Sequence, residues 1–481
     1  MDDTLTRSAW SDSRIPASLW FVSIGSSLAA IPFLFFIDIL FVGLGLLGLA
    51  VVLISLDDRY RMFILVALLP LSHAGVGLSD LGGFGPYDIF LAWFILLFLW
   101  RAGPLTLFRF ELPRPIWLSG AMILAFIPSV INSGISPEAA KAFLQLFGSV
   151  LTAAGVYDIL RRREDPAFIR KLLMFFVGVA ALVSVYGLLQ TAISGSLISV
   201  AIGRAYFSFF QDVNYYSGYL LMALAVAIGL VLSSRAGLSR LLLLGCIVVL
   251  IIAVIATVSR SALVVFFLLM LAYVAYLVLQ RGVQKWIGAL LVGGVVGVMS
   301  LVVFTDLGKR MVDLLTLSRR IETVLVGQDA SLQQRANILL VTARMIKSHP
   351  VAGVGFGSFE ETFERYKETY LSTGFKRSAH NTYLRVAAET GIIGFSAFVV
   401  FLVSLLRTIL QGIRLTRRTP FEVTFLSVAF SLGTFLLMSA TLDQMFEPHF
   451  WVMVGIALAY GSVLKRLLGS NDIHRSDHAH A

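Results

Sequence analysis

The sequence predicts an all-α protein, built as a polytopic transmembrane helical bundle with one long helical loop on the extracytoplasmic side. Three observations predict this class. Of the 481 residues, 58% are hydrophobic and only 14% are charged, which is far from the balance of a soluble domain. Apolar runs of about 20 residues, the length that spans a bilayer, recur along the chain and predict about 12–14 helices. Basic residues gather in alternate loops, so the formal charge of +10 indicates a membrane protein and no nucleic-acid partner.

The first apolar run, from Ala17 to Ile37, follows a polar N-terminal segment. It is too long for a signal peptide and lacks a small-residue cleavage site, so we expect a retained helix. The lone Cys246 lies inside another apolar run, which excludes a disulfide framework and a cysteine metal site. The further candidate spans lie near residues 39–56, 62–78, 88–100, 116–131, 142–160, 168–190, 214–232, 241–258, 261–279, 286–305, 382–406, 423–441 and 449–464.

Lysine and arginine in the short loops predict the orientation, because basic loops remain in the cytoplasm. With the N-terminus inside, the cytoplasmic loops carry clusters of basic residues at 59–61, 101–114, 161–171, 235–240, 281–285, 407–418 and 465–466. The opposite short loops, at 79–88, 132–141 and 443–449, carry at most one. Both termini are therefore predicted to face the cytoplasm.

One outer connection is long, from about Asp306 to Ala379, and loops of that length are usually functional. Within it, Ser331 is followed three residues later by a glutamine, which is the pattern of a helix N-cap. Ile338, Val341 and Met345 then fall on one helical face. We expect an amphipathic helix that lies at the membrane surface or caps the bundle.

Three residues stand out on an outer face whose short loops otherwise carry almost no lysine or arginine: Arg204, Arg260 and His380. Charged groups at membrane depth are costly and tend to be functional, and a guanidinium is well suited to phosphate. Structural roles are the alternatives. Arg260 could cap its helix or reach lipid headgroups, Arg204 could anchor at the interface, and His380 could be a hydrogen-bonded polar residue at a helix start.

Two neighbouring patterns favour structural roles. Arg385 and Glu389 are four residues apart on one predicted helix, a spacing at which they pair with each other. The run GVGFGS, from Gly353 to Ser358, superficially resembles a phosphate loop. It follows no strand and lacks the Gly-Lys-Ser end, so nucleotide binding is rejected.

The segment HNTYLRVAAETGIIG begins with His380 and Asn381. Nine residues separate Asn381 from Gly391, and two residues separate Gly391 from Gly394. This pattern resembles the histidine motif of the O-antigen ligase and O-antigen polymerase family. HPVAGVGFGSF looks like the family's lead-in to that motif, and RAYFSFFQDVNYYSGYL and TVSRSALVVF look like its two arginine regions. The resemblance is good from about residue 203 to residue 394.

The predicted organisation is an N-terminal transmembrane half (1–202), a catalytic transmembrane region (203–464) that includes the helical loop 306–380, and a disordered cytoplasmic tail (465–481).

The resemblance implies a GT-C type glycosyltransferase in the bacterial inner membrane, working at the periplasmic face in lipopolysaccharide or exopolysaccharide biosynthesis. Its donor would be a glycan on undecaprenyl diphosphate, and its acceptor a second glycan or lipid A core. It implies no metal or other cofactor, and it adds other polysaccharide-assembly proteins as partners. By position, Arg204 and Arg260 would hold the diphosphate and His380 would act as base. The candidates for sugar binding or support are Asp212, Asn214, Tyr215, Asn381 and Glu389.

The sequence departs from the family in one place. The ligase branch has a leucine four residues after its arginine, where this chain has Val264 after Arg260. Polymerisation of an exopolysaccharide or O-antigen is therefore at least as well supported as ligation to lipid A. From other classes, the alternatives are a transporter or flippase and a structural membrane partner with a degenerate site. A transporter predicts broken helices at the midplane, internal repeats and charges in mid-span, and this sequence instead gathers its polar residues at one face.

Overall fold

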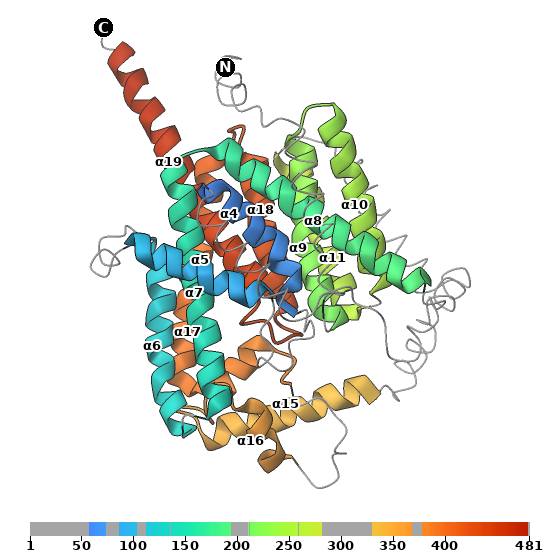
Figure 1. Cartoon of the computed structure of the whole chain (residues 1–481), viewed down its shortest axis with the longest axis vertical. Helices are drawn as coiled ribbons and strands as arrows, with labels where there is room; N and C mark the ends of the chain where they lie inside the picture. Colours follow the sequence, from blue (N-terminus) through green and yellow to red (C-terminus); the bar gives the residue numbers. More distant parts are fainter. Residues whose placement is uncertain are drawn as a thin grey trace, which may run out of the picture.

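The computed structural model describes residues 57–73, 86–102, 112–134, 136–193, 210, 212–257, 259–280, 330–367 and 378–479. Within these ranges all regular structure is helical, which confirms the predicted all-α class (Figure 1). The helices are α4 (Asp58–Leu68), the 3₁₀ helix η1 (Leu69–His73), α5 (Pro86–Ala102), α6 (Arg114–Asn132), α7 (Pro137–Arg163), α8 (Pro166–Ile193), α9 (Val213–Ser233), α10 (Leu238–Ala256), α11 (Arg260–Gln280), α15 (Ala330–Ser348), α16 (Phe359–Tyr366), α17 (Thr382–Thr416), α18 (Glu422–Met438) and α19 (Pro448–Ala479).

Eight of the described helices, α6 to α11, α17 and α19, are long and apolar enough to cross a membrane, and α5 and α18 are shorter apolar helices. The predicted polytopic bundle is therefore confirmed. The candidate spans at 17–37, 39–56 and 286–305 lie outside the described residues. α19 continues to Ala479, into the residues 465–481 for which the composition predicted a disordered tail.

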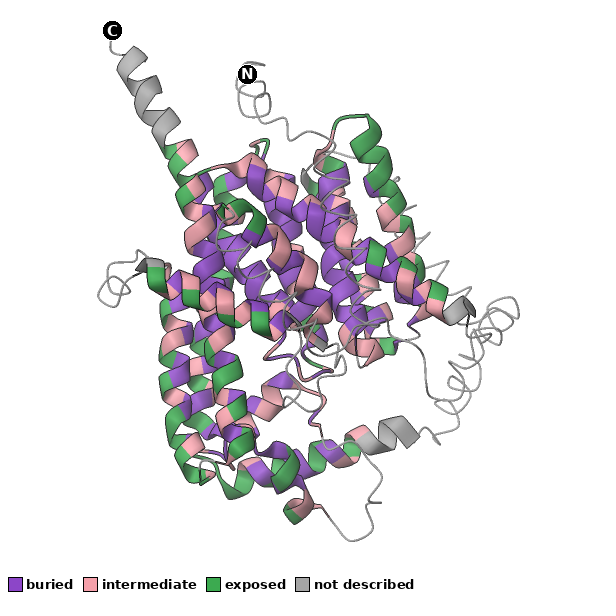
Figure 2. Ribbon diagram, viewed as in Figure 1, coloured by how far each residue is buried: buried purple, intermediate pink, exposed green. Residues whose placement is uncertain are grey.

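The most enclosed helix is α9, which packs against α8, α10, α11 and α18. In α9 83% of the apolar span is buried, against 22% in α10, which lies at the outside of the bundle (Figure 2). A Cβ atom on Gly229 of α9 would lie 2.2 Å from the Cβ of Ser427 of α18. The missing side chain therefore lets these two helices approach closely, as small residues do in membrane bundles.

Loops that the basic residues predict to lie on the same side also contact one another. At one end, Arg170 donates to the hydroxyls of Ser233 and Ser234, and Arg466 pairs with Glu164. At the other end, which we call the outer end, segments 212–215 and 378–382 are each hydrogen-bonded to segment 439–447. Segments 129–136 and 349–359 are hydrogen-bonded to each other and to residues 388–392 of α17. These contacts agree with the predicted alternation of loops, and which end faces the cytoplasm stays a prediction.

Helix α17 folds back on itself at Gly391, whose backbone is not helical (φ +59°, ψ −162°). The rings of Tyr383 and Phe398 have centroids only 6.2 Å apart, whereas fifteen residues of straight helix would separate them by about 22 Å. The prediction of one continuous span over 382–406 was therefore wrong. Residues 382–390 form a short first arm, and residues 392–416 form a second arm that is itself longer than the ~20 residues a span requires.

Segment 349–358 stabilises this break. The Val354 N–H donates to the carbonyl of Ala388 at 2.9 Å, and the Ile392 N–H donates to the carbonyl of Pro350 at 2.8 Å. Backbone groups that the broken helix cannot pair internally are satisfied in this way. A Cβ on Gly353 would lie 2.2 Å from the carbonyl carbon of Glu389, so the glycine-rich run allows the two backbones to touch.

Helix α15 has the predicted buried face, since Ile338, Val341 and Met345 are at most 2% exposed. They pack with Phe359 and Phe363 of α16 in a small separate core. α15 packs against α16 and α17 at the outer end of the bundle (Figure 1), a position that agrees with the predicted capping role. The predicted cap at Ser331 was wrong, because α15 already begins at Ala330.

Candidate active site

His380 lies immediately before the first arm of α17, with a left-handed backbone (φ +48°), and it is half-buried. The Asn381 side chain caps α17 by accepting from the N–H of Leu384 at 3.0 Å, and its amide donates to the carbonyl of Ala440 at 2.9 Å. The Thr382 N–H and hydroxyl both donate to the carbonyl of Leu442. A left-handed conformation is costly for a residue with a Cβ and persists only where the surroundings fix it. The connection between α18 and α19 therefore fixes the backbone that carries the imidazole.

Asp443, in that connection, joins three parts of the site. Its carboxylate, 5% exposed, accepts from the Ser378 hydroxyl at 2.7 Å and from the Arg385 guanidinium at 3.2 Å. Its backbone carbonyl accepts from the hydroxyl of Tyr215 at 2.8 Å. The segment before His380, the first arm of α17 and the start of α9 thus meet at one residue.

The start of α9 also reaches the start of α11. Asp212 caps α9 by accepting from the N–H of Asn214 at 2.7 Å, and the Asn214 amide donates to the same carboxylate. The Ser259 hydroxyl donates to the Asn214 side-chain carbonyl at 2.7 Å. Arg260, the next residue, is exposed at the first turn of α11. Hydrogen bonds and adjacent residues therefore connect the segment of Arg260 to that of His380.

The structure thus brings most of the predicted site residues to the outer end of the bundle: Asp212, Asn214, Tyr215, Arg260, His380 and Asn381. Arg204 lies outside the described residues. Asp212 and Asn214 hydrogen-bond to each other, and the Tyr215 hydroxyl is engaged by Asp443, so all three help to build the outer end.

Glu389 lies at the far end of the first arm and is 1% exposed. Its carboxylate accepts from Arg385 at 3.0 Å and from the N–H of Phe359, the first residue of α16, at 3.1 Å. The pairing of Arg385 with Glu389 that the sequence predicted is therefore observed. Burial and these contacts give Glu389 a supporting position, away from any exposed surface.

Sequence reasoning missed Asp443 and Ser378. The distribution of lysine and arginine predicts orientation and carries no information on these two residues; an acidic residue in a short connection between two apolar helices was the available signal. Among the described residues, no group of three or more His, Cys, Asp or Glu side chains could hold a metal ion.

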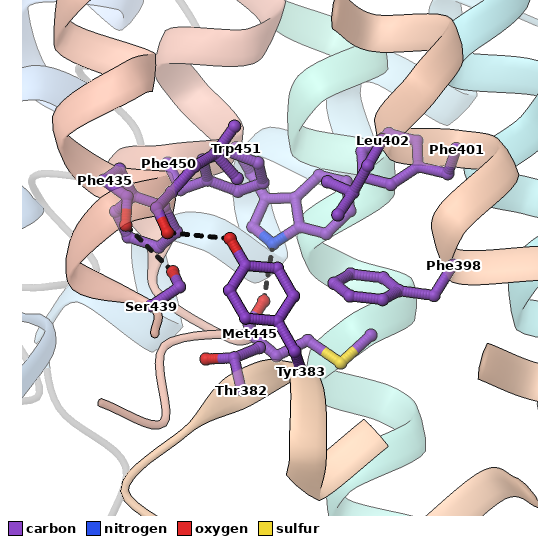
Figure 3. A pocket seen from close by; sticks show the side chains of 11 residues that line it. Thr382, Tyr383, Phe398, Phe401, Leu402, Phe435, Ser439, Met445, Phe450 and Trp451 are labelled. Carbon is purple, nitrogen blue, oxygen red and sulfur yellow. Dashed lines mark hydrogen bonds between the residues drawn. The ribbon is translucent and has the colours of Figure 1, made fainter. Parts of the chain in front are cut away.

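An aromatic pocket lies beside the start of α17, between α17, α18 and α19 (Figure 3). Phe398, Phe401, Phe435, Phe450 and Trp451 form much of its wall, together with Thr382, Tyr383, Leu402, Leu436, Ser439 and Met445. The polar atoms drawn at its edge are paired, since the Tyr383 hydroxyl donates to the carbonyl of Leu436 and the Trp451 N–H donates to that of Met445. The pocket is therefore apolar. His380 and Asp443 are not among the residues that line it.

Fold and site together define a polytopic membrane protein whose polar site is built from the outer ends of several helices. The family model described as O-antigen ligase matches residues 245–399, which contain α11, α15, α16 and the His380 motif. This match, over about a third of the 481 residues, supports the resemblance carried by that motif: residues 245–399 are similar to the O-antigen ligase domain. No curated protein matches the chain.

Proposed function

We propose that this protein transfers a glycan from undecaprenyl diphosphate to an acceptor at the periplasmic face of a bacterial inner membrane. The acceptor is another glycan chain, as in a polymerase, or lipid A core, as in a ligase. One observation carries the proposal: the O-antigen ligase match includes both Arg260 and His380, and their segments are connected at one end of the bundle.

In the proposed reaction, the acceptor hydroxyl attacks the anomeric carbon of the donor sugar while the bond from that carbon to the diphosphate oxygen breaks. His380 takes the hydroxyl proton, a role for which an imidazole is suited near pH 7. The departing diphosphate keeps the bonding electron pair, and Arg260, with Arg204, stabilises its growing negative charge. Two guanidiniums supply this stabilisation without a metal ion. The site lies at helix ends within a membrane bundle, where a lipid-linked donor can enter from the bilayer.

Replacement of His380 by alanine tests the proposal. A general base contributes about 100-fold or more, so His380→Ala should abolish polysaccharide lengthening or attachment while the protein remains inserted. His349→Ala is the matched control, because His349 is an exposed histidine of segment 349–358 and lies outside the proposed machinery. Gel analysis of surface glycans in a complemented deletion strain measures the effect. Full activity of His380→Ala would remove the catalytic proposal.

The same deletion strain separates the polymerase from the ligase. Loss of chain length with single repeats retained indicates a polymerase, and full-length chains left on the lipid carrier indicate a ligase. A flippase would instead leave the lipid-linked donor on the cytoplasmic side in the deletion strain.

A further inference from the structure

Three charged side chains form a cluster behind His380. Arg385 donates to Glu389 at 3.0 Å and to Asp443 at 3.2 Å, and the three side chains are 18%, 1% and 5% exposed. Each carboxylate also holds a group from a different segment. Glu389 accepts from the Phe359 N–H, and Asp443 accepts from the Ser378 hydroxyl. The cluster therefore connects the start of α16 to the residues that precede His380.

The Ser378 hydroxyl continues this connection to His380 itself. Its oxygen accepts from the backbone N–H of His380 at 3.4 Å while it donates to Asp443 at 2.7 Å. A continuous series of polar contacts runs from Glu389 through Arg385, Asp443 and Ser378 to His380. Members of such a network polarise one another and restrict each other's geometry.

Stability alone is a weak reason for this cluster. Burying two carboxylates and one guanidinium carries a desolvation cost, and well-packed apolar residues of similar volume often stabilise a fold equally well. The better-attested use of a buried ionic group is to select one arrangement among several. Here the arrangement selected is the left-handed turn that carries His380, because Ser378 and Asn381 on either side are held by segment 439–447.

We propose that Arg385 and Asp443 are positioning residues for His380. Arg385 orients the Asp443 carboxylate, this carboxylate holds Ser378 and with it the turn that presents the imidazole, and Glu389 fixes Arg385 against α16. The inference rests on the proposed function, in which His380 is the base. It adds two residues that act through another residue, one of which, Asp443, lies outside the O-antigen ligase match.

The charges of the cluster also act on the imidazole of His380 electrostatically. Among the described residues, the charged groups at this end of the bundle include Arg385 and Glu389 on α17, Asp443 and Glu447 between α18 and α19, Asp212 before α9, and Arg260 on α11. Removal of the Asp443 charge makes the surroundings of His380 more positive and lowers the pKa of its imidazole. Removal of the Arg385 charge raises that pKa. A unit charge at several ångströms shifts a pKa by about half a unit or more.

The experiment measures this pKa without using activity. Full-length protein in nanodiscs is treated with diethyl pyrocarbonate, which modifies unprotonated imidazole, over a range of pH, and mass spectrometry quantifies His380. We expect the midpoint for His380 to fall in Asp443→Asn and to rise in Arg385→Met. The exposed His349 in the same samples is the internal reference and should not shift. Equal His380 midpoints in both variants and the wild type overturn the proposal.

Transfer is then measured with lipid-linked glycan extracted from the deletion strain as donor. Asp443→Asn and Arg385→Met should lower kcat about tenfold with little change in KM, because orientation of the base is lost. Arg385→Lys should recover part of the rate. Unchanged kcat in Asp443→Asn overturns the positioning role.

A further variant covers the case in which Asp443→Asn does not insert. Ser378→Ala removes the hydroxyl that links Asp443 to His380 but leaves the ion pair of Arg385 and Asp443. It should lower kcat several-fold and leave the His380 midpoint unchanged. An unchanged kcat overturns the proposal. Asp58→Asn removes a comparable partner at the opposite end of the bundle, where Arg61 pairs with Asp58 at 3.0 Å, and it should change neither readout. An active His380→Ala would refute the proposed function instead, so the two failures are distinguishable.

Discussion

Replacement of Gly391 by alanine should destabilise the protein and remove transfer, because it acts on the fold-back of α17. The backbone of Gly391 (φ +59°, ψ −162°) lies in a region that is essentially restricted to glycine. An added Cβ would lie 2.3 Å from the carbonyl oxygen of Val351, which is impossible without movement of the backbone. That movement would break the hydrogen bond from Ile392 to Pro350.

The magnitude follows from these two effects. A residue with a Cβ in this backbone region costs about 1–3 kcal/mol, and each buried hydrogen bond left unmade costs roughly 1–3 kcal/mol. We therefore expect Gly391→Ala to lower the free energy of unfolding by about 3–5 kcal/mol. For 481 residues the entropy of unfolding is about 1 kcal/mol/K, so the midpoint of thermal unfolding should fall by roughly 3–5 °C.

Thermal unfolding of the purified protein in detergent, followed by tryptophan fluorescence, measures the change. Gly245→Ala, in the exposed helix α10, is the matched control, because nothing lies within 4 Å of its added Cβ and alanine suits a helix interior. It should leave stability equal or slightly higher. If Gly391→Ala unfolds at the same temperature as Gly245→Ala and still transfers glycan, the fold-back is not required and the reasoning fails.

The remaining predictions concern the proposed diphosphate site and the packing of the bundle. Arg260→Ala should lower transfer about 100-fold with unchanged unfolding, and Arg260→Lys should retain part of the activity, both measured by surface-glycan analysis. Gly229→Ala should lower the free energy of unfolding by about 1–3 kcal/mol, because its Cβ would overlap Ser427. Thermal unfolding measures this change, and Ser427→Gly in the same protein should restore part of the lost stability. Trp451→Phe should cost about 1 kcal/mol through loss of the hydrogen bond to Met445 and leave transfer unchanged.

Much of the fold could be predicted from the sequence because hydropathy and helical periodicity report burial directly. The apolar runs predicted the class of protein, and the spacing of Ile338, Val341 and Met345 predicted the buried face of α15. The fold-back could not be predicted in this way. Residues 382–406 are apolar enough to be interpreted as one span, and a glycine within an apolar run is compatible with a straight helix. Only the contact with segment 349–358, distant in sequence, shows that Gly391 has a special backbone.

The candidate site was predicted less completely. His380, Asn381 and Arg260 were identified as exceptions on a face with few basic residues or through the family motif, and the structure holds their segments at one end of the bundle. Asp443 was missed because its importance comes from tertiary contacts. Its carboxylate reaches Ser378 and Arg385, which lie 65 and 58 residues away in sequence. Spacing rules apply within one helix, so they predicted the pair of Arg385 and Glu389. They could not predict that Asp443, from another segment, joins this pair.

The spacing of the histidine motif has a physical meaning in this structure. The nine residues between Asn381 and Gly391 are the first arm of α17, which at 1.5 Å per residue is about 13 Å long. One end of the arm is fixed by the glycine contact with segment 349–358, and the other end carries His380 to the connection between α18 and α19. Because both ends are fixed, the arm length sets how far His380 lies from the cap formed by α15 and α16. The glycine and the histidine of the motif are therefore coupled, since the glycine turns the chain and the arm places His380.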